Sequence, residues 1–187
     1  MEKHMHKSII SVVGQDRPGI VADVAAILAE LECNIEDVSQ TILQGQFAAL
    51  FIASIPGAQS VNEVRTSLED RLAPQGLNCV VREFEESAAP SPREAASFVI
   101  ITIGPDAPGL IAAMAGVLKT HAVNICNLQA VNRSQAYPDQ MVMIYEVTVP
   151  EDTSLPALRT ALQQRAARDG LEVSVQHKAI FEEIHRL

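Results

Sequence analysis

Apolar residues recur along the first half of the chain with two different spacings. In two segments they lie three and four positions apart, as on one face of an amphipathic helix. These positions are Ile20, Val21, Val24, Ile27, Leu28 and Leu31 in the first segment, and Val61, Val64, Leu68 and Leu72 in the second. Around them, runs rich in Ile, Val and Phe predict strands over 8–13, 34–43, 47–55 and 77–84, with a hairpin turn at 44–46.

The second half of the chain shows the same alternation of spacings. Apolar runs predict strands over 98–103, 124–131 and 141–149, and a last strand that begins at 171. Helical spacing links Leu110, Ile111, Met114, Val117 and Leu118, and then Leu155, Leu158 and Leu162. Both halves therefore follow the order βαββαβ.

The two halves also share sequence, which indicates a tandem duplication. Residues 14–21 return as 104–111, and Asn34-Ile35 returns as Asn124-Ile125, both 90 positions later. From Pro56, which matches Pro150, the separation is 94 positions, so four extra residues enter the second half. We place them in the polar stretch 133–139 and expect a longer, more mobile hairpin there.

The order of elements predicts the α+β class and the ferredoxin-like plan, in which four antiparallel strands carry two helices on one face. We expect domains over 1–86 and 97–187 and a semi-extended linker over 87–96. Strand 47–53 is apolar on both faces, although the helices can cover only one. The other face is expected to be covered by the partner half or by a second subunit in a homodimer.

Composition and charge exclude several classes of protein. The 187 residues carry a net charge of −9 and no Trp, so direct nucleic-acid binding is not expected. No apolar run approaches the roughly 20 residues of a membrane span, and the N-terminus has no secretory pattern, so we expect a cytoplasmic protein. The three cysteines lack metal or redox spacing, and His4 with His6 stands at a terminus expected to fray. We therefore expect neither a metal nor a cofactor.

The segment that precedes the first helix of each half is the candidate binding site. Pro18 fits the first helical position, which leaves the amides that follow it without acceptors inside the helix and able to bind an anion. Asp16 can accept a hydrogen bond from an ammonium group, so the two features together suit a free amino acid. The alternative is that this aspartate only caps the helix. The residues so defined are Gly14, Asp16, Gly19 and Ile20, and in the second half Gly104, Asp106, Gly109 and Leu110.

Two further pairs complete the candidate site at the start of the following strand. They are Asn34 with Ile35, and Asn124 with Ile125. For both asparagines a turn role is favoured over a ligand contact, because Asn tolerates the left-handed backbone that is common between a helix and a strand.

These motifs resemble those of a known family. A strand followed by residues 16–21, an amphipathic helix and residues 33–37 resembles the ACT domain, and two such domains resemble the glycine cleavage system transcriptional repressor group. The resemblance implies that a small amino acid such as glycine or serine binds where two domains lie side by side. It also implies a protein partner, the DNA-bound activator of the glycine cleavage operon. The contacts implied are those of Gly14, Asp16 and Ile35, and of Gly104, Asp106 and Ile125.

The function expected on these grounds is that of a non-catalytic, amino-acid-sensing regulator. The first half also resembles the N-terminal region of formyltetrahydrofolate deformylase, but two ACT units leave too little chain for a catalytic domain. No catalytic motif occurs in the sequence, so no enzyme activity is expected. The alternative is an ACT-domain adaptor, or an allosteric regulator of a metabolic enzyme, that binds no ligand itself.

Overall fold

The computed structural model describes residues 5–57, 59–84, 95–134 and 137–184. The chain divides into two compact units, Met1–Ser87 and Ala88–Leu187. Most of the expected linker, 87–96, lies outside the described residues, and its last two positions belong to a strand. The domain limits 1–86 and 97–187 stay a prediction.

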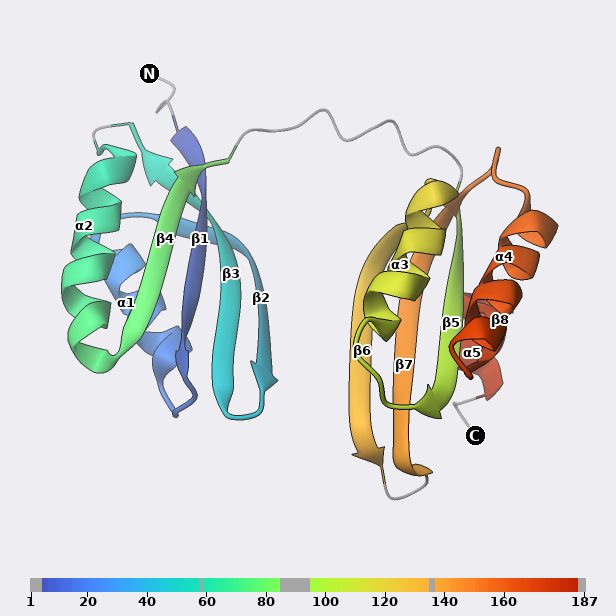
Figure 1. Ribbon diagram of the computed structural model, residues 1–187. Helices are drawn as coiled ribbons and strands as arrows, with labels where there is room; N and C mark the ends of the chain where they lie inside the picture. Colours follow the sequence, from blue (N-terminus) through green and yellow to red (C-terminus); the bar gives the residue numbers. More distant parts are fainter. Residues whose placement is uncertain (1–4, 58, 85–94, 135–136, 185–187) are drawn as a thin grey trace. The chain divides into compact units, whose positions relative to one another are not determined.

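The first unit has the predicted order βαββαβ (Figure 1). Its strands form one antiparallel sheet in the order β2-β3-β1-β4. Both helices lie on the same face of this sheet, which confirms the ferredoxin-like plan. The elements are β1 (Met5–Gln15), α1 (Ile20–Glu30), β2 (Asn34–Leu43), β3 (Gln46–Pro56), α2 (Val61–Leu72), a 3-10 turn η1 (Ala73–Gln75) and β4 (Leu77–Glu83).

The core of the first unit lies between the two helices and the sheet. On β1, Ile10 and Val12 point toward the helices and are fully buried. The predicted helical stripes bury Ile20, Val24, Ile27 and Leu28 of α1 and Val64, Leu68 and Leu72 of α2. Periodicity therefore identified most of the core, because three-and-four spacing places these side chains on one helix face. Val21 of the predicted stripe is 37% exposed and is not part of the core.

The second unit repeats the plan with the sheet order β6-β7-β5-β8. It ends in a short helix that the sequence pattern did not predict, α5 (Lys178–Ile184). The other elements are β5 (Ala95–Pro105), α3 (Leu110–Thr120), β6 (Asn124–Ser134), β7 (Tyr137–Pro150), α4 (Leu155–Arg168) and β8 (Glu172–His177).

The four extra residues of the second half lengthen its middle strands. The strands β6 and β7 have 11 and 14 residues, whereas β2 and β3 have 10 and 11. Two residues connect the strands in both hairpins, so the hairpin is longer but its connection is not. The connecting residues 135–136 lie outside the described part of the chain.

The entry and the exit of the first helix differ from the sequence prediction. Helix α1 begins at Ile20 rather than Pro18, because Gly19 adopts a left-handed conformation (φ 95°) at the N-cap. No side chain caps this end, so the interpretation of Asp16 as a cap is wrong.

The left-handed residue after each first helix lies earlier than expected. It is Glu32 (φ 54°) in the first unit and Ala122 (φ 56°) in the second, whereas both asparagines begin strands. The amide of Cys33 bonds to the Leu28 carbonyl at 2.8 Å and that of Glu32 to the Ala29 carbonyl at 3.0 Å. This Schellman pattern fixes the left-handed position directly after the helix C-cap.

Candidate ligand-binding site

The first turn of α1 presents backbone amides that have no acceptor within the helix. The first bond within this helix joins the amide of Asp23 to the carbonyl of Gly19 at 2.9 Å. Pro18 and Gly19 form a turn that closes weakly onto the Arg17 carbonyl. In the described part of the chain, the amides of Ile20, Val21 and Ala22 make no hydrogen bond of ordinary length and angle. Since the helix dipole adds positive potential at this end, these three amides favour an anionic group.

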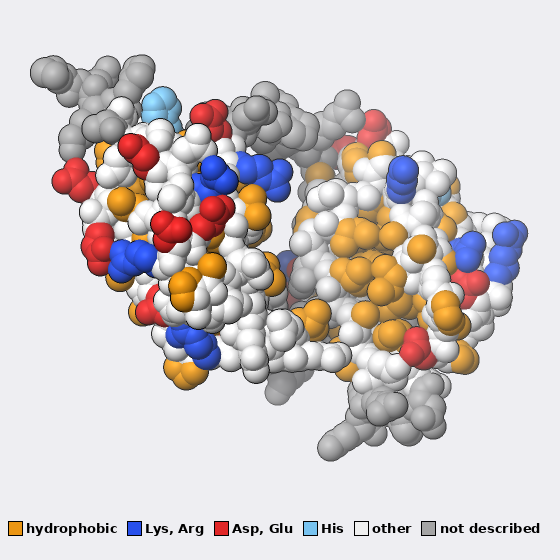
Figure 2. Space-filling model, turned by 60° about the vertical axis from the view of Figure 1, so that its left-hand side comes forward, with side chains coloured by type: hydrophobic (Ala, Val, Ile, Leu, Met, Phe, Trp, Pro, Cys, Tyr) orange, Lys and Arg blue, Asp and Glu red, His pale blue; other side chains and the backbone are white. Residues whose placement is uncertain are grey.

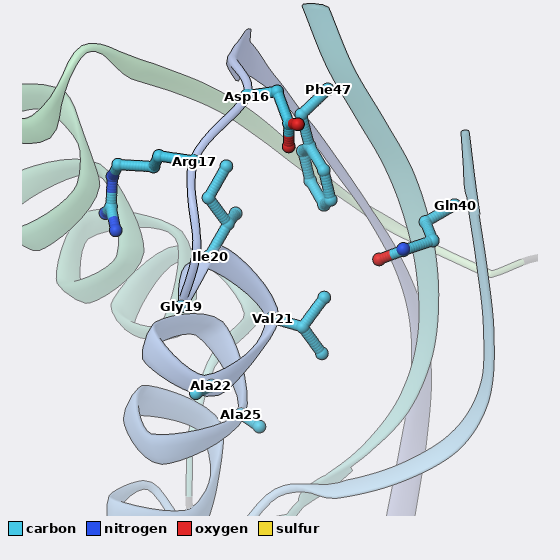
Figure 3. Close-up of a pocket in the computed structure, with 9 residues that line it drawn as sticks. All are labelled: Asp16, Arg17, Gly19, Ile20, Val21, Ala22, Ala25, Gln40 and Phe47. Carbon is cyan, nitrogen blue, oxygen red and sulfur yellow. The ribbon is translucent and has the colours of Figure 1, made fainter. Parts of the chain in front are cut away.

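Asp16 and Arg17 point in opposite directions from the loop that precedes α1 (Figure 3). The Arg17 guanidinium donates to Oδ2 of Asp23 at 2.8 Å and also bonds to the side-chain oxygen of Gln75, so it ties the loop to α1 and η1. The Asp16 carboxylate makes no hydrogen bond or ion pair with any described residue. The chain therefore leaves one negative group unpaired beside the free amides, with the nearby cation turned away.

A cavity of about 490 Å³ lies between the start of α1 and strands β2 and β3. Asp16 stands at its rim, and the Gln40 amide of β2 points into it from the opposite side (Figure 3). The buried side chains Ile20 and Phe47 form part of its wall. The remaining lining residues are Arg17, Gly19, Val21, Ala22 and Ala25. A carboxylate, free amides and an apolar wall thus meet in one place.

The matching corner of the second unit is built differently. Gly109 (φ 92°) again stands at the N-cap of α3, and no side chain caps the helix. Here, however, Nδ2 of Asn132 donates to Oδ2 of Asp106 at 2.5 Å. Asn132 occupies the place that Ile42 has in the first half, and Ala107 replaces Arg17. The second aspartate therefore already has a partner within its own unit.

The two leading glycines of the motif have a packing role. A Cβ atom on Gly14 would lie 2.7 Å from the carbonyl oxygen of Gly76, and one on Gly104 would lie 2.8 Å from that of Gly170. Both distances are far below an ordinary contact, so only glycine lets β1 and β5 approach the turn that precedes their neighbouring strand. Gly14 is not among the residues that line the cavity.

The structure brings only some of the candidate residues together. Asp16, Gly19 and Ile20 line the cavity of the first unit, whereas Asn34 and Ile35 lie at the start of β2, outside the lining. In the second unit, Asp106, Gly109 and Leu110 surround the start of α3, and Asn124 donates to Sγ of Cys126 at 3.6 Å. Ile125 is the second residue of β6 and packs against the core of its unit.

Sequence reasoning missed the far wall of the cavity. Gln40 and Phe47 come from β2 and β3, and nothing in the motif points to them. Strand alternation places Gln40 on the helix-facing side of β2, but only the register with β3 shows that it lies across from the start of α1. Val21 belonged to the predicted core stripe, yet it is partly exposed at the cavity.

The charged surface, the clusters of possible metal ligands and the helix lengths bear on which other kinds of site the described residues could form. On the face seen in Figure 2, Lys and Arg side chains are interspersed with Asp and Glu and do not gather into one basic area. Within the described ranges, no three His, Cys, Asp or Glu side chains are close enough together to hold a metal ion. None of the helices described by the structure has the length and apolarity required to traverse a membrane.

Comparisons with known proteins fit this architecture. A UPF0237 protein of Methanopyrus kandleri is 38% identical over 79 residues, which is 42% of this chain and 88% of that protein. A UPF0237 protein of Clostridium acetobutylicum is 36% identical over 78 residues, 41% of this chain and 88% of its own length. Each therefore corresponds to about one of the two units.

Two solved structures span nearly the whole chain and share its fold. A protein of Galdieria sulphuraria described as unknown superposes with a TM-score of 0.74 at 24% identity, and covers 93% of this chain and 99% of its own. A protein provisionally named a glycine cleavage system transcriptional repressor superposes with a TM-score of 0.62 at 19% identity, over 92% and 97%. The sequence profile of the ACT domain matches residues 6–82 and 97–176. The chain therefore belongs to the ACT-domain family, with one domain in each unit.

Proposed function

We propose that this chain is a cytoplasmic, non-catalytic regulator that binds a small amino acid at the corner between β1 and α1 of its first unit. ACT domains are regulatory domains that generally bind small amino acids, and the chain consists of two of them. The observation that carries the proposal is the unpaired Asp16 carboxylate beside the free amides of α1, at the edge of a cavity. A zwitterion complements both groups, because its carboxylate accepts from the amides and its ammonium group donates to Asp16.

The volume and the apolar wall of the cavity indicate how large the side chain of the bound amino acid can be. Glycine and serine are the ligands suggested by the family resemblance. At a ceiling of about −1.5 kcal/mol per heavy atom, glycine gains roughly −7.5 kcal/mol, a Kd of a few micromolar at best. A volume of about 490 Å³ with Phe47 and Ala25 in its wall leaves room for a larger aliphatic side chain. Alanine, valine and leucine therefore belong in any ligand panel.

The output of such a sensor is a change in protein contact. A small ligand can shift a conformational equilibrium only by its differential affinity for the two states. The formal charge of −9 and the mixed charges seen in Figure 2 favour a protein partner over nucleic acid. The family resemblance implies the DNA-bound activator of the glycine cleavage operon as that partner. In this proposal, amino-acid binding changes the surface that meets the activator.

A thermal-shift screen tests the ligand half of the proposal. With a Kd of about 0.1–1 mM, a ligand at about 10 mM stabilises the unit that binds it by about 1.4–2.7 kcal/mol. For a unit of this size the melting temperature then rises by at least about 5 °C. We expect Asp16→Ala to remove this shift and Asp106→Ala to retain it, because Asp106 is already paired with Asn132. Equal shifts in both variants would assign the aspartates no role in binding.

The second candidate function is an adaptor that binds no ligand. The paired corner of the second unit favours it, because one of the two motif copies is satisfied by its own chain. An adaptor of this kind, or an allosteric regulator of a metabolic enzyme, would show no thermal shift with glycine, serine, alanine, valine or leucine. It would still bind its partner in pull-down experiments with purified proteins.

A further inference from the structure

The sheet of the first unit has an open face on the side away from its helices. The exposed fractions are 48% for Val13 of β1, 49% for Leu50 of β3 and 50% for Val80 of β4. The strand register places these three side chains together, because Ser11 pairs with both Leu50 and Val80, and Val13 lies in the next row. In the described part of this unit, both helices lie on the other face (Figure 1). The centre of the open face is thus apolar and accessible.

The second unit covers part of the same face with its own C-terminal helix. Val99 of β5 points away from α3 and α4, yet only 2% of its surface is exposed. Its cross-strand neighbour Glu146 accepts from Nζ of Lys178, the first residue of α5, at 2.6 Å. Helix α5 therefore lies on the outward face of this sheet. On the same face, Val131 of β6 stays 46% exposed, so α5 covers this face only in part. In the first unit, no described helix lies on the corresponding face.

The charges on the open face of the first unit are arranged asymmetrically. One row across the sheet runs Asp37, Ile52, Ile9 and Arg82, with a charged residue on each edge strand. Three strand spacings separate Asp37 from Arg82, roughly 14 Å, so they cannot pair within one molecule. Neither has an oppositely charged partner among the described residues.

The neighbouring charged group on this face is already satisfied. Glu36 pairs with Nζ of Lys7 at 3.1 Å and also accepts from the Ser54 hydroxyl. The hydrogen bond from Ser54 and the charge of Lys7 lower the pKa of the Glu36 carboxyl. The described charges on this face that remain available to pair with another molecule are therefore Asp37 and Arg82, one on each edge strand.

We propose that this face binds a second copy of the chain, with the two sheets packed face to face about a two-fold axis that runs along the strands. This axis brings each edge of one sheet over the opposite edge of the other. Asp37 of each copy then faces Arg82 of the other, and Ile52 faces Ile9. The interface is self-complementary in charge and closes after two copies.

The geometry of sheet packing is compatible with this arrangement. Packed sheets keep their strands within about 30° of each other. Such a rotation displaces the edge strands, which lie roughly 7 Å from the axis, by about 4 Å. The long side chain of Arg82 can span this offset. The apolar rows at the centre stay in contact, because they lie close to the axis.

The size of the face sets the expected strength of the dimer. Four strands about 4.8 Å apart and seven residues of about 3.4 Å give a footprint of roughly 450 Å². This is about half of the ~800 Å² per partner of a standard interface. We therefore expect a dimer that dissociates in the micromolar range.

Sedimentation velocity of the full chain from about 1 to 100 μM tests the proposal. Each single reversal, Asp37→Arg or Arg82→Asp, places like charges opposite each other and should weaken dimerisation about tenfold or more. The double variant restores opposite charges and should return to within about threefold of the native chain. Asp70→Arg, on the exposed surface of α2, is the matched control and should leave the dimer intact.

Several outcomes overturn the proposal. These are a monomer at every concentration, a dimer insensitive to the single reversals, and a double variant no better than the singles. Leu50→Asp gives an independent check, because its side chain is half exposed and the monomer should tolerate the change. A folded Leu50→Asp chain that still dimerises like the native chain also contradicts the proposal. Amino-acid binding should persist in all these variants, since the cavity lies on the helix side of the sheet.

Discussion

Replacing Gly104 by Ala should destabilise the second unit, whereas replacing Gly116 by Ala should stabilise it. A Cβ on Gly104 would lie 2.7 Å from Cδ2 of Leu171 and 2.8 Å from the carbonyl oxygen of Gly170. The leucine side chain can move, but the carbonyl is fixed. Gly170 is left-handed (φ 69°), and the amide of Leu171 bonds back to Ala166 at 2.8 Å. The strand β5 must therefore move away from the end of α4.

The two substitutions are expected to change the free energy of unfolding in opposite directions. Overpacking of this kind costs about 1–3 kcal/mol, offset by about 0.5–1 kcal/mol from the lower backbone entropy of the unfolded Ala chain. The net loss for Gly104→Ala therefore lies between about 0 and 2.5 kcal/mol, centred on about 1 kcal/mol, which is several degrees in melting temperature. Gly116 lies inside α3 with nothing within 4 Å of the added methyl group. There, helix propensity favours Ala by about 0.5–1 kcal/mol.

Tyrosine fluorescence can follow this unit alone during urea unfolding. The chain has no Trp and two Tyr, and both Tyr137 and Tyr145 belong to the second unit. Unfolding midpoints and slopes for the native chain and the two variants then report the free energy of unfolding of that unit. A Gly104→Ala chain as stable as the native one would refute the packing role of this glycine. If Gly116→Ala lowered the free energy of unfolding, the expected gain from helix propensity in α3 would be contradicted.

Three further substitutions probe the second unit. Burial raises the pKa of Tyr145 to about 12, and its hydroxyl donates only to a thioether, so Tyr145→Phe should leave the unfolding free energy unchanged or raise it by up to about 1 kcal/mol. The ion pair with Lys178 lowers the pKa of the Glu146 carboxyl in the folded protein. The ion pair therefore stabilises the fold fully above the ordinary Glu pKa of 4.5, and this stabilisation is lost as pH falls through the lower, folded value. Lys178→Met should therefore cost about 0.2–1 kcal/mol at pH 7 and nothing in acid, measured by urea unfolding at both pH values. Asn132→Ile frees the carboxylate of Asp106, and this variant should gain an amino-acid-dependent thermal shift that the native second unit lacks.

The fold could be predicted from the sequence because its signals are local or repeated. Helical spacing predicted α1 and α2, and the duplication allowed the same order of elements to be predicted for the second half. The start of α1 was misplaced because proline at a first helical position and glycine at an N-cap give the same local pattern. In the structure the N-cap is Gly19, because glycine adopts φ 95° without strain.

The lining of the candidate cavity could be predicted only in part, since its remaining residues depend on register and on tertiary contacts. Asp16 and Ile20 were found from the motif, but Gln40 and Phe47 meet them only through the pairing of β2 with β3. The difference between the two corners was equally hidden. It rests on the contact of Asn132 with Asp106, across 26 positions of the chain. Helix α5 escaped prediction because its seven residues are too few to show a helical period.

The proposed amino-acid site depends on the free amides of α1, and amide chemical shifts report on these groups directly. The measurement is a nitrogen–proton correlation spectrum of the labelled chain, titrated separately with glycine, serine, alanine, valine and leucine. At least one of these amino acids is expected to move the amides of Ile20, Val21 and Ala22 and to leave those of Leu110 and Ile111 in place. Spectra in which no amino acid moves the amides of α1, or in which the largest shifts lie elsewhere, would contradict the account.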